Sequence, residues 1–141
     1  MRTLSDNLAI RQALDPASYN NVASVGDWIA MRGFRRCLFV VNLGATTGAV
    51  TVQVQEATDA SGTGAQDISG LTGSFTATDD NKLGIIEVRA EDLSEGYTHV
   101  AVEVTPAAAG TLLAATAILG EPYSAPVSNA AADGVVFDVG E

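Results

Sequence analysis

The side chains that most often carry catalysis are few in this sequence and widely spaced. It has one histidine, His99, and one cysteine, Cys37, in 141 residues. A nucleophilic site needs a nucleophile with a base within reach, most often histidine or lysine. His99 belongs to a segment of alternating valines, and Cys37 stands in the apolar stretch RRCLFVV. Because apolar surroundings favour the neutral thiol, we expect Cys37 to be an inert buried thiol that forms no pair with His99.

Two pairs of neighbouring acids are the other candidates for chemistry, Asp79–Asp80 and Glu91–Asp92. Two carboxylates suffice for glycoside hydrolysis, but both pairs fall in predicted turns, where acids are common. The segment TDDNK and Asp59 lack the spacing of a calcium loop, and SGTGAQ precedes no helix that would receive a phosphate. The sequence therefore predicts no catalytic residue, no cofactor-binding residue and no metal ligand. We expect a protein that is not an enzyme.

The charge is distributed unevenly along the chain. There are 7 basic and 17 acidic residues, for a net charge of −10. Most of the basic residues stand near the N-terminus, and we predict that they bind an acidic partner: Arg2, Arg11, Arg32, Arg35 and Arg36. Ordinary surface arginines would explain them equally well, and the last two are also expected to pair with acids of the same chain. The negative excess elsewhere argues against nucleic acid as a partner, because binding to nucleic acid depends on neutralising phosphates.

The chain is long enough for one domain and shows no membrane or export signal. Its apolar stretches are much shorter than the roughly 18 residues that cross a bilayer. The N-terminus, MRTLSDNLAIRQALD, is polar where a secretion signal is apolar. We therefore expect no membrane partner and synthesis in the cytoplasm.

Alternating hydrophobic residues predict β-strands along most of the chain. Val50, Val52 and Val54 alternate with Thr and Gln, and a second set of alternating valines occupies positions 100, 102 and 104. Arg35–Leu43 is almost continuously apolar, which predicts a central strand covered on both faces. The short turn GATTG predicts that this strand pairs with 49–56 as an antiparallel hairpin. For LLAATAILG, the short length and the flanking Pro and Gly favour a strand over a helix.

The sequence therefore predicts an all-β, single-domain antiparallel β-sandwich or small barrel of about seven to nine strands. Residues 1–24 form an N-terminal arm or irregular lead-in, with a short strand at Leu8–Leu14. Residues 25–122 form the β domain. Residues 123–141 form a C-terminal tail in which GVVFDV is a candidate final edge strand. The polar segment Ala57–Asp67 is a candidate contact loop.

Two stretches carry a resemblance to a known family, FVVNLGATTGAVTVQVQEA and ILGEPYSAP. Over about residues 22–127 the chain resembles small head proteins of tailed phages, of the capsid decoration (cement) type. The resemblance implies a β-rich structural protein, often a homotrimer, that binds the major capsid protein on the outside of the virion. Another virion component (a tail, connector or head-fibre subunit) or a non-viral β-sandwich binding module remains as an alternative. A hydrolase fits the residues least well.

If the chain docks on an acidic capsid surface, its basic N-terminal third is expected to face that surface. Residues 1–24 then order on binding and lie across subunit seams. Deletion of residues 1–20 is expected to leave the β domain folded and to weaken its attachment.

Overall fold

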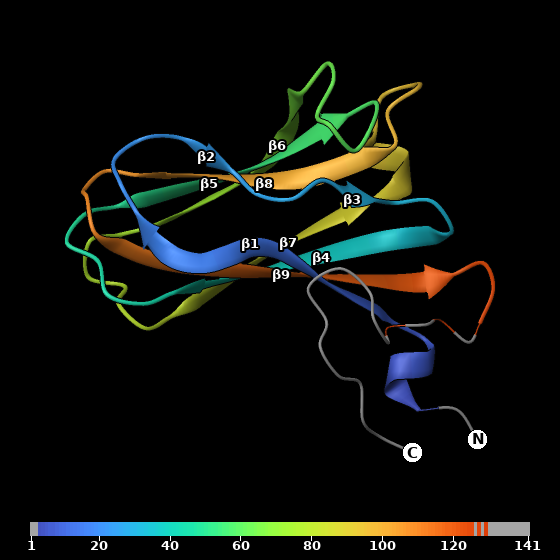
Figure 1. The fold of residues 1–141 in the computed structure, drawn as a ribbon, viewed down its shortest axis with the longest axis horizontal. Helices are drawn as coiled ribbons and strands as arrows, with labels where there is room; N and C mark the ends of the chain where they lie inside the picture. The colour runs from blue at the N-terminus through green and yellow to red at the C-terminus, as the bar shows by residue number, and fades with distance from the viewer. Residues whose placement is uncertain (1–2, 126, 128, 130–141) are drawn as a thin grey trace.

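The computed structural model describes residues 3–125, 127 and 129 and shows two antiparallel β-sheets packed face to face (Figure 1). Sheet A has the strand order β1-β9-β4-β7, and sheet B has the order β2-β8-β5-β6, with β3 also paired to β8. The strands are β1 (Ala9–Tyr19), β2 (Ser24–Val25), β3 (Ile29–Ala30), β4 (Phe34–Leu43), β5 (Val50–Ala57), β6 (Gln66–Phe75), β7 (Leu83–Arg89), β8 (His99–Pro106) and β9 (Thr111–Pro122). Short 3₁₀ turns are η1 (Leu4–Asp6) and η2 (Ala90–Asp92). The predicted all-β sandwich is confirmed, since the two sheets stay separate and do not close into a barrel.

The core lies between the sheets and is filled by one face of each strand. The predicted alternations are confirmed: the valines at 50, 52, 54, 100, 102 and 104 are all buried. From sheet A, Cys37, Phe39 and Val41 of β4 and Leu119 of β9 pack against them. LLAATAILG lies within β9, so the strand prediction for this segment is confirmed. Within the described residues, no helix has the length and hydropathy needed to span a bilayer.

The predicted hairpin between β4 and β5 is wrong. β4 pairs with β7 and β9, whereas β5 pairs with β6 and β8. The GATTG segment therefore crosses from one sheet to the other. Its Thr46 is buried, donates from Oγ1 to the Gly48 carbonyl at 2.7 Å and lies 3.4 Å from Thr111 Oγ1. Alternation requires that one face of a strand be buried, and two strands that oppose each other across a core meet this requirement as well as two paired strands do.

β4 is covered on one face only, which corrects the prediction of a strand buried on both sides. Its inward residues are buried, but Leu38 and Val40 point away from the core and remain partly exposed. The continuous apolar run therefore combines a core face with an aliphatic outer face.

The segment predicted as an arm carries a full strand. β1 runs for 11 residues, and its pairing with β9 extends from Ala9 opposite Leu119 to Tyr19 opposite Thr111. Ala9, Ala13 and Leu14 belong to the core. The register shifts twice between residues 12 and 17, which interrupts the alternation of buried positions. These bulges explain why the sequence showed no period here. The strand is also longer than the predicted Leu8–Leu14.

The described C-terminal residues lie beside the N-terminal segment, on the free side of the edge strand β1. Asn129 is buried, and its Oδ1 accepts a hydrogen bond from the Ile10 amide at 2.7 Å. Its Nδ2 donates to the carbonyls of Ser5 at 3.0 Å and Leu8 at 2.7 Å. The side chain thus satisfies backbone groups that no neighbouring strand reaches. The candidate strand GVVFDV lies outside the described residues.

Candidate functional site

The five arginines predicted to bind an acidic partner are not gathered into one patch. Arg35 and Arg36 are neighbours on β4, and Arg11 lies on β1, two strands away in sheet A. Arg32 is exposed in the turn before β4. Arg2 lies outside the described residues.

Arg11 is held in place by its own chain. Its Nη1 donates to the Ile10 carbonyl at 2.9 Å and to Asn129 Oδ1 at 3.1 Å. The guanidinium is half-buried and helps to fix the contact between the two terminal segments.

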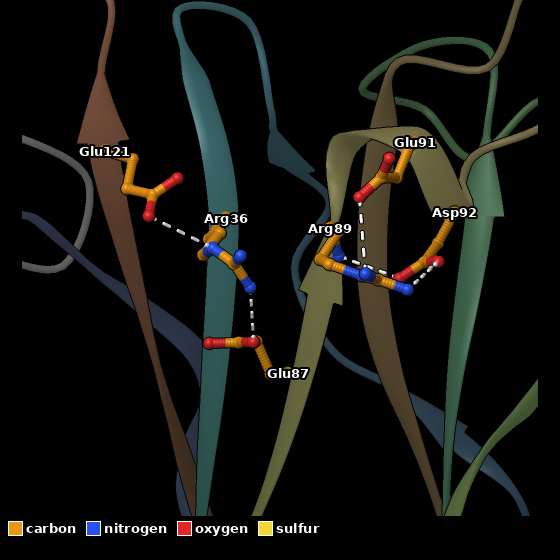
Figure 2. Close-up of polar contacts among 6 residues, drawn as sticks. All are labelled: Arg36, Glu87, Arg89, Glu91, Asp92 and Glu121. Carbon is orange, nitrogen blue, oxygen red and sulfur yellow. Dashed lines mark hydrogen bonds and ion pairs between the residues drawn. The ribbon is translucent and has the colours of Figure 1, made fainter.

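Arg36 lies between two acids from neighbouring strands of sheet A, as Figure 2 shows. Its Nη1 is 2.9 Å from Glu87 Oε2 on β7, and its Nε is 3.2 Å from Glu121 Oε1 on β9. The charge of Glu121, followed by the hydrogen bond and charge of Glu87, raises the pKa of Arg36. The predicted pairing with acids of the same chain is confirmed for this residue. Because all three side chains are exposed, the pairing contributes little to stability.

A second arginine, Arg89, makes a similar local arrangement at the end of β7 (Figure 2). Its Nη1 is 3.4 Å from Glu91 Oε1, and its Nη2 is 3.6 Å from Asp92 Oδ1. The Arg89 amide also donates to Asp92 Oδ2 at 2.9 Å. The acidic pair at 91 and 92 therefore closes the η2 turn, and its charges are engaged by a neighbouring arginine.

These residues surround an open hollow of about 480 Å³ at one end of sheet A. Arg35 borders it and stacks on Tyr123, with Cζ 4.5 Å from the ring centroid. The hollow is lined by Arg35, Arg36, Arg89, Ala90, Glu91, Glu121 and Tyr123. It carries both signs of charge on groups that are already paired or stacked, an arrangement suited to polar contact with another surface.

The predicted contact loop between β5 and β6 has a defined internal structure. Asp59 Oδ1 accepts hydrogen bonds from the amides of Ser61 at 2.9 Å and Thr63 at 3.1 Å. The hydrogen bonds from Thr63, and a further one from Ser61, lower the pKa of Asp59 despite a small opposing effect of desolvation. The Thr58 amide closes the loop by donating to the Thr63 carbonyl at 3.0 Å.

The same loop rests on two aromatic side chains. A Cβ atom at Gly62, where φ is +82°, would lie 2.5 Å from Trp28 Nε1, so the backbone passes directly over the indole. The Tyr97 hydroxyl donates to the Gly64 carbonyl at 3.2 Å. Residues 58–65 thus project from the sandwich in a shape that is set before any partner binds.

Cys37 and His99 lie in opposite sheets, on β4 and β8. Cys37 is fully buried, and desolvation raises its pKa to about 12, so the thiol is neutral at physiological pH. His99 Nδ1 is 2.8 Å from the Thr98 hydroxyl. The structure therefore keeps the nucleophile and base candidates apart, as the sequence predicted.

Asp79 and Asp80 also accept hydrogen bonds from backbone amides. Asp79 Oδ2 accepts from the Thr76 amide at 2.8 Å, and its Oδ1 is 3.1 Å from Lys82 Nζ. Asp80 Oδ2 accepts from the Thr46 amide at 3.4 Å. Among the described residues, no three His, Cys, Asp or Glu side chains are grouped to hold a metal ion.

Sequence reasoning missed the buried carboxylate of Glu56. This side chain is 2% exposed at the end of β5. Its Oε1 accepts from the Ser94 amide, and its Oε2 accepts from Ser94 Oγ and Gln66 Nε2, each at 2.7 Å. Glu56 thus ties the β5–β6 end to the loop between η2 and β8. Its position after three buried valines, at an inward site of the alternation, was the available signal.

Sequence reasoning also missed the outer face of sheet A, which is mainly aliphatic and has the ion pair of Arg36 and Glu87 at one end. The strand registers place Val40 beside Ile85 and Thr116, and Leu38 beside Ile118. The sheet A outer face comprises Ile10, Gln12, Arg36, Leu38, Val40, Asn42, Leu83, Ile85, Glu87, Leu112, Ala114, Thr116 and Ile118. The outer face of sheet B is instead polar, with Thr51 paired to Thr105 and Gln53 to Glu103. The two layers of the sandwich therefore present chemically different surfaces.

No family model matches this chain, and no curated protein matches it. Solved structures include similar folds. One is a chain from Bacillus endospore appendages, described as a novel family of disulfide-linked pili, with 12% identity and a TM-score of 0.51 over 86% of this chain and 97% of that chain. Another is the SPBc2 prophage-derived protein YomS, with 10% identity and a TM-score of 0.45 over 82% of this chain and 94% of that chain. At 12% identity, the likeness to the appendage chain shows a shared fold alone.

Proposed function

We propose that this chain is a non-catalytic structural subunit of a tailed-phage particle, bound to the major capsid protein on the outer surface of the shell as a decoration (cement) protein. The observation that carries the proposal is the sheet A outer face. In a chain of net charge −10, a mainly aliphatic face whose charges Arg36 and Glu87 are ion-paired at one end is expected to be covered in an assembly. The resemblance of residues 22–127 to phage head proteins indicates that this assembly is a phage capsid.

A decoration subunit must hold its shape while it bridges other surfaces. The loop at 58–65 meets this need, because its hydrogen bonds to Asp59 and its packing on Trp28 order it in the free chain. Binding through an ordered loop loses little conformational entropy. The loop is therefore our candidate for the contact with the shell.

Only some of the arginines that were predicted to bind an acidic partner are available for this role. Arg36 is paired within the domain, whereas Arg35 stacks on Tyr123 and forms no ion pair with a described residue. Arg35 and the exposed Arg32 remain the candidates for an acidic partner. Because residues 9–19 form a strand of sheet A, deletion of residues 1–20 would remove part of the core rather than a separable arm.

The test is binding to shells assembled from the major capsid protein of the phage that encodes the chain. Purified protein is mixed with these shells, which are then sedimented and imaged at a resolution that traces chains. Decoration of the outer surface is the expected result, and Arg32→Glu with Arg35→Glu should weaken it while Arg36→Ala leaves it nearly unchanged. Absence from the shell, or location of the chain in the tail, connector or head fibre, would overturn the decoration role.

A further inference from the structure

We propose that residues 134–139 of one copy of this chain add a strand to the free edge of β7 in the next copy. The sequence of this segment, GVVFDV, predicts an edge strand, and the segment lies outside the described residues. The inference goes beyond the proposed function, because it concerns the contact between copies and not the contact with the shell.

β7 has the only long and regular free edge among the strands that the structure describes. It runs for seven residues, pairs within sheet A only with β4, and keeps that register without a shift. Leu83 and Ile85, which point outward, are 59% and 60% exposed. Unpaired backbone groups flanked by large apolar side chains form a template for a further strand unless something covers them.

The edges of sheet B are short or irregular. At β6, the pairing with β5 shifts register between Asp67 and Thr72, and Gly70 within this interval has φ of +84°. At the other edge, β2 and β3 have two residues each. Edges of this kind discourage the addition of a strand.

The free edge of β1, where Asn129 lies, is occupied by side chains and loops of the same chain. Asn129 Oδ1 accepts from the Ile10 amide at 2.7 Å, and Arg11 Nη1 donates to the Ile10 carbonyl at 2.9 Å. Further along β1, the Ala13 carbonyl accepts from the Asp27 amide at 2.8 Å. A strand that continued from Asn129 along β1 would therefore meet backbone groups that already have partners.

The segment cannot begin its pairing on β7 of its own chain. In the order β1-β9-β4-β7, three strand spacings separate β1 from β7, and one more on each side reaches the positions beside their free edges. At about 4.8 Å per spacing this is about 24 Å. Asn129 lies on the β1 side, and an extended chain from it to Gly134 covers at most about 18 Å, at about 3.6 Å per residue. The β7 edge within reach therefore belongs to another copy.

β7 requires a partner strand with apolar residues on both faces. Leu83 and Ile85 point outward, whereas Val88 is buried in the core and Ile86 packs against it. The charge of Glu87 is already paired with Arg36, as that of Arg89 is with the acids of η2. The edge therefore presents apolar surface without an unpaired charge.

The segment meets this requirement. Val135, Phe137 and Val139 alternate with Val136 and Asp138, so apolar residues occur in both phases of the alternation. β-branched and aromatic residues also favour strands. It is the one stretch outside the described residues with this pattern.

Pairing of β7 with β7 of another copy fits less well. An antiparallel pair of these strands over their full length would set Leu83 opposite Arg89 and Ile85 opposite Glu87. Each exposed apolar side chain would then face a charged one, which is an unfavourable cross-strand pair. A donor segment from a different part of the chain avoids this.

The contact is head to tail. The donor segment follows Asn129 on the β1 side of sheet A, and the acceptor β7 forms the opposite edge. Contacts between two different surfaces close into a ring or continue as a filament, depending on the rotation between copies. The trimer that the resemblance implies is one such ring.

The association state of the protein alone tests the inference. Sedimentation velocity at micromolar concentration should show an oligomer larger than the 14.4 kDa chain. Val135→Pro with Val136→Pro should weaken the association by at least about tenfold, because successive amides point to opposite sides of a strand and one of them must donate to β7. Val135→Thr with Val136→Thr keeps both amides and is the matched control, which should remain associated. A monomeric wild-type chain, or an oligomer that the two prolines leave unchanged, would overturn the inference.

Cysteine variants test which surfaces meet. Cys37 is the only cysteine and is fully buried, so each variant gains a single accessible thiol. Chains with Ile85→Cys are mixed with chains that carry either Val135→Cys or Val136→Cys and are oxidised. One of the two mixtures should give a covalent heterodimer, because neighbouring residues of a strand point to opposite faces. Thr51→Cys, on the outer face of sheet B, replaces Ile85→Cys in the control and should give none.

Equal cross-linking in the control, or none in either mixture, would contradict the contact between β7 and the segment. A chain that carries both cysteines and closes its disulfide internally would contradict the exchange between copies. These measurements contain no shells, so failure to associate and failure to decorate shells are separate results.

Discussion

The strongest test of how this sandwich is held together is removal of the Glu56 side chain. Glu56→Ala removes a buried carboxylate that accepts three hydrogen bonds at 2.7 Å from Ser94 and Gln66. A hydrogen bond to a charged group contributes about 1.5–3 kcal/mol. Ser94 and Gln66 are themselves exposed, so water replaces part of what is lost. We therefore expect a decrease of about 2–3 kcal/mol in the free energy of unfolding, well below the sum of three bonds.

The assay is urea denaturation at pH 7, followed by tryptophan fluorescence and far-UV circular dichroism. Glu95→Ala is the matched control, because it removes one negative charge from an exposed position in the same loop as Ser94. Glu95→Ala should change the free energy of unfolding by less than about 0.5 kcal/mol. A loss for Glu56→Ala no larger than that for Glu95→Ala would refute the role assigned to the carboxylate.

The pH dependence of the same variant follows from the direction of the Glu56 pKa. Burial raises this pKa, but the hydrogen bonds from Gln66 and Ser94 outweigh burial and lower it below the ordinary value of 4.5. A carboxyl with a lower pKa in the folded state stabilises the fold fully above the unfolded pKa, and this contribution is lost as the pH falls through the folded pKa. The difference between wild type and Glu56→Ala should therefore be constant from pH 7 to about 5 and shrink below pH 4.5. A difference in the free energy of unfolding that grows on acidification would show that folding raises the pKa of Glu56 instead of lowering it.

Three further predictions follow from individual contacts. Asn129→Ala should lower the free energy of unfolding by about 1–3 kcal/mol and accelerate hydrogen exchange at the Ile10 amide, because that amide loses its acceptor; unchanged exchange would contradict the contact. Gly62→Ala should displace the 58–65 loop and change the fluorescence of Trp28, since the residue has φ of +82° and no room for Cβ, whereas Gly70→Ala, with a similar φ of +84° and open space, should leave the fluorescence unchanged. Cys37 should resist alkylation in the folded protein at pH 8 and react fully in denaturant, because its pKa is about 12; fast labelling of the folded protein would show an accessible thiolate.

The sequence by itself determined which segments form strands and which of their residues face the core. Val50, Val52 and Val54 show this, because a period of two requires one buried face wherever the strand lies. The same pattern predicted only a short strand at Leu8–Leu14 in place of β1, since two register shifts break the alternation and place Leu14 inward out of phase. Local hydrophobicity was therefore sufficient only for strands without bulges.

Only the tertiary structure decided which strands pair and which surfaces result. Alternation cannot distinguish a neighbour in the same sheet from a strand across the core, so β4 and β5 were predicted to pair although they lie in different sheets. Arg36 finds Glu87 at a separation of 51 residues, which no local pattern encodes. The sheet A outer face is likewise assembled from four strands, and each contributes only two to four residues to it. Its mainly aliphatic character exists only after long-range pairing has brought those residues together, because no single segment contains enough of them to be recognised.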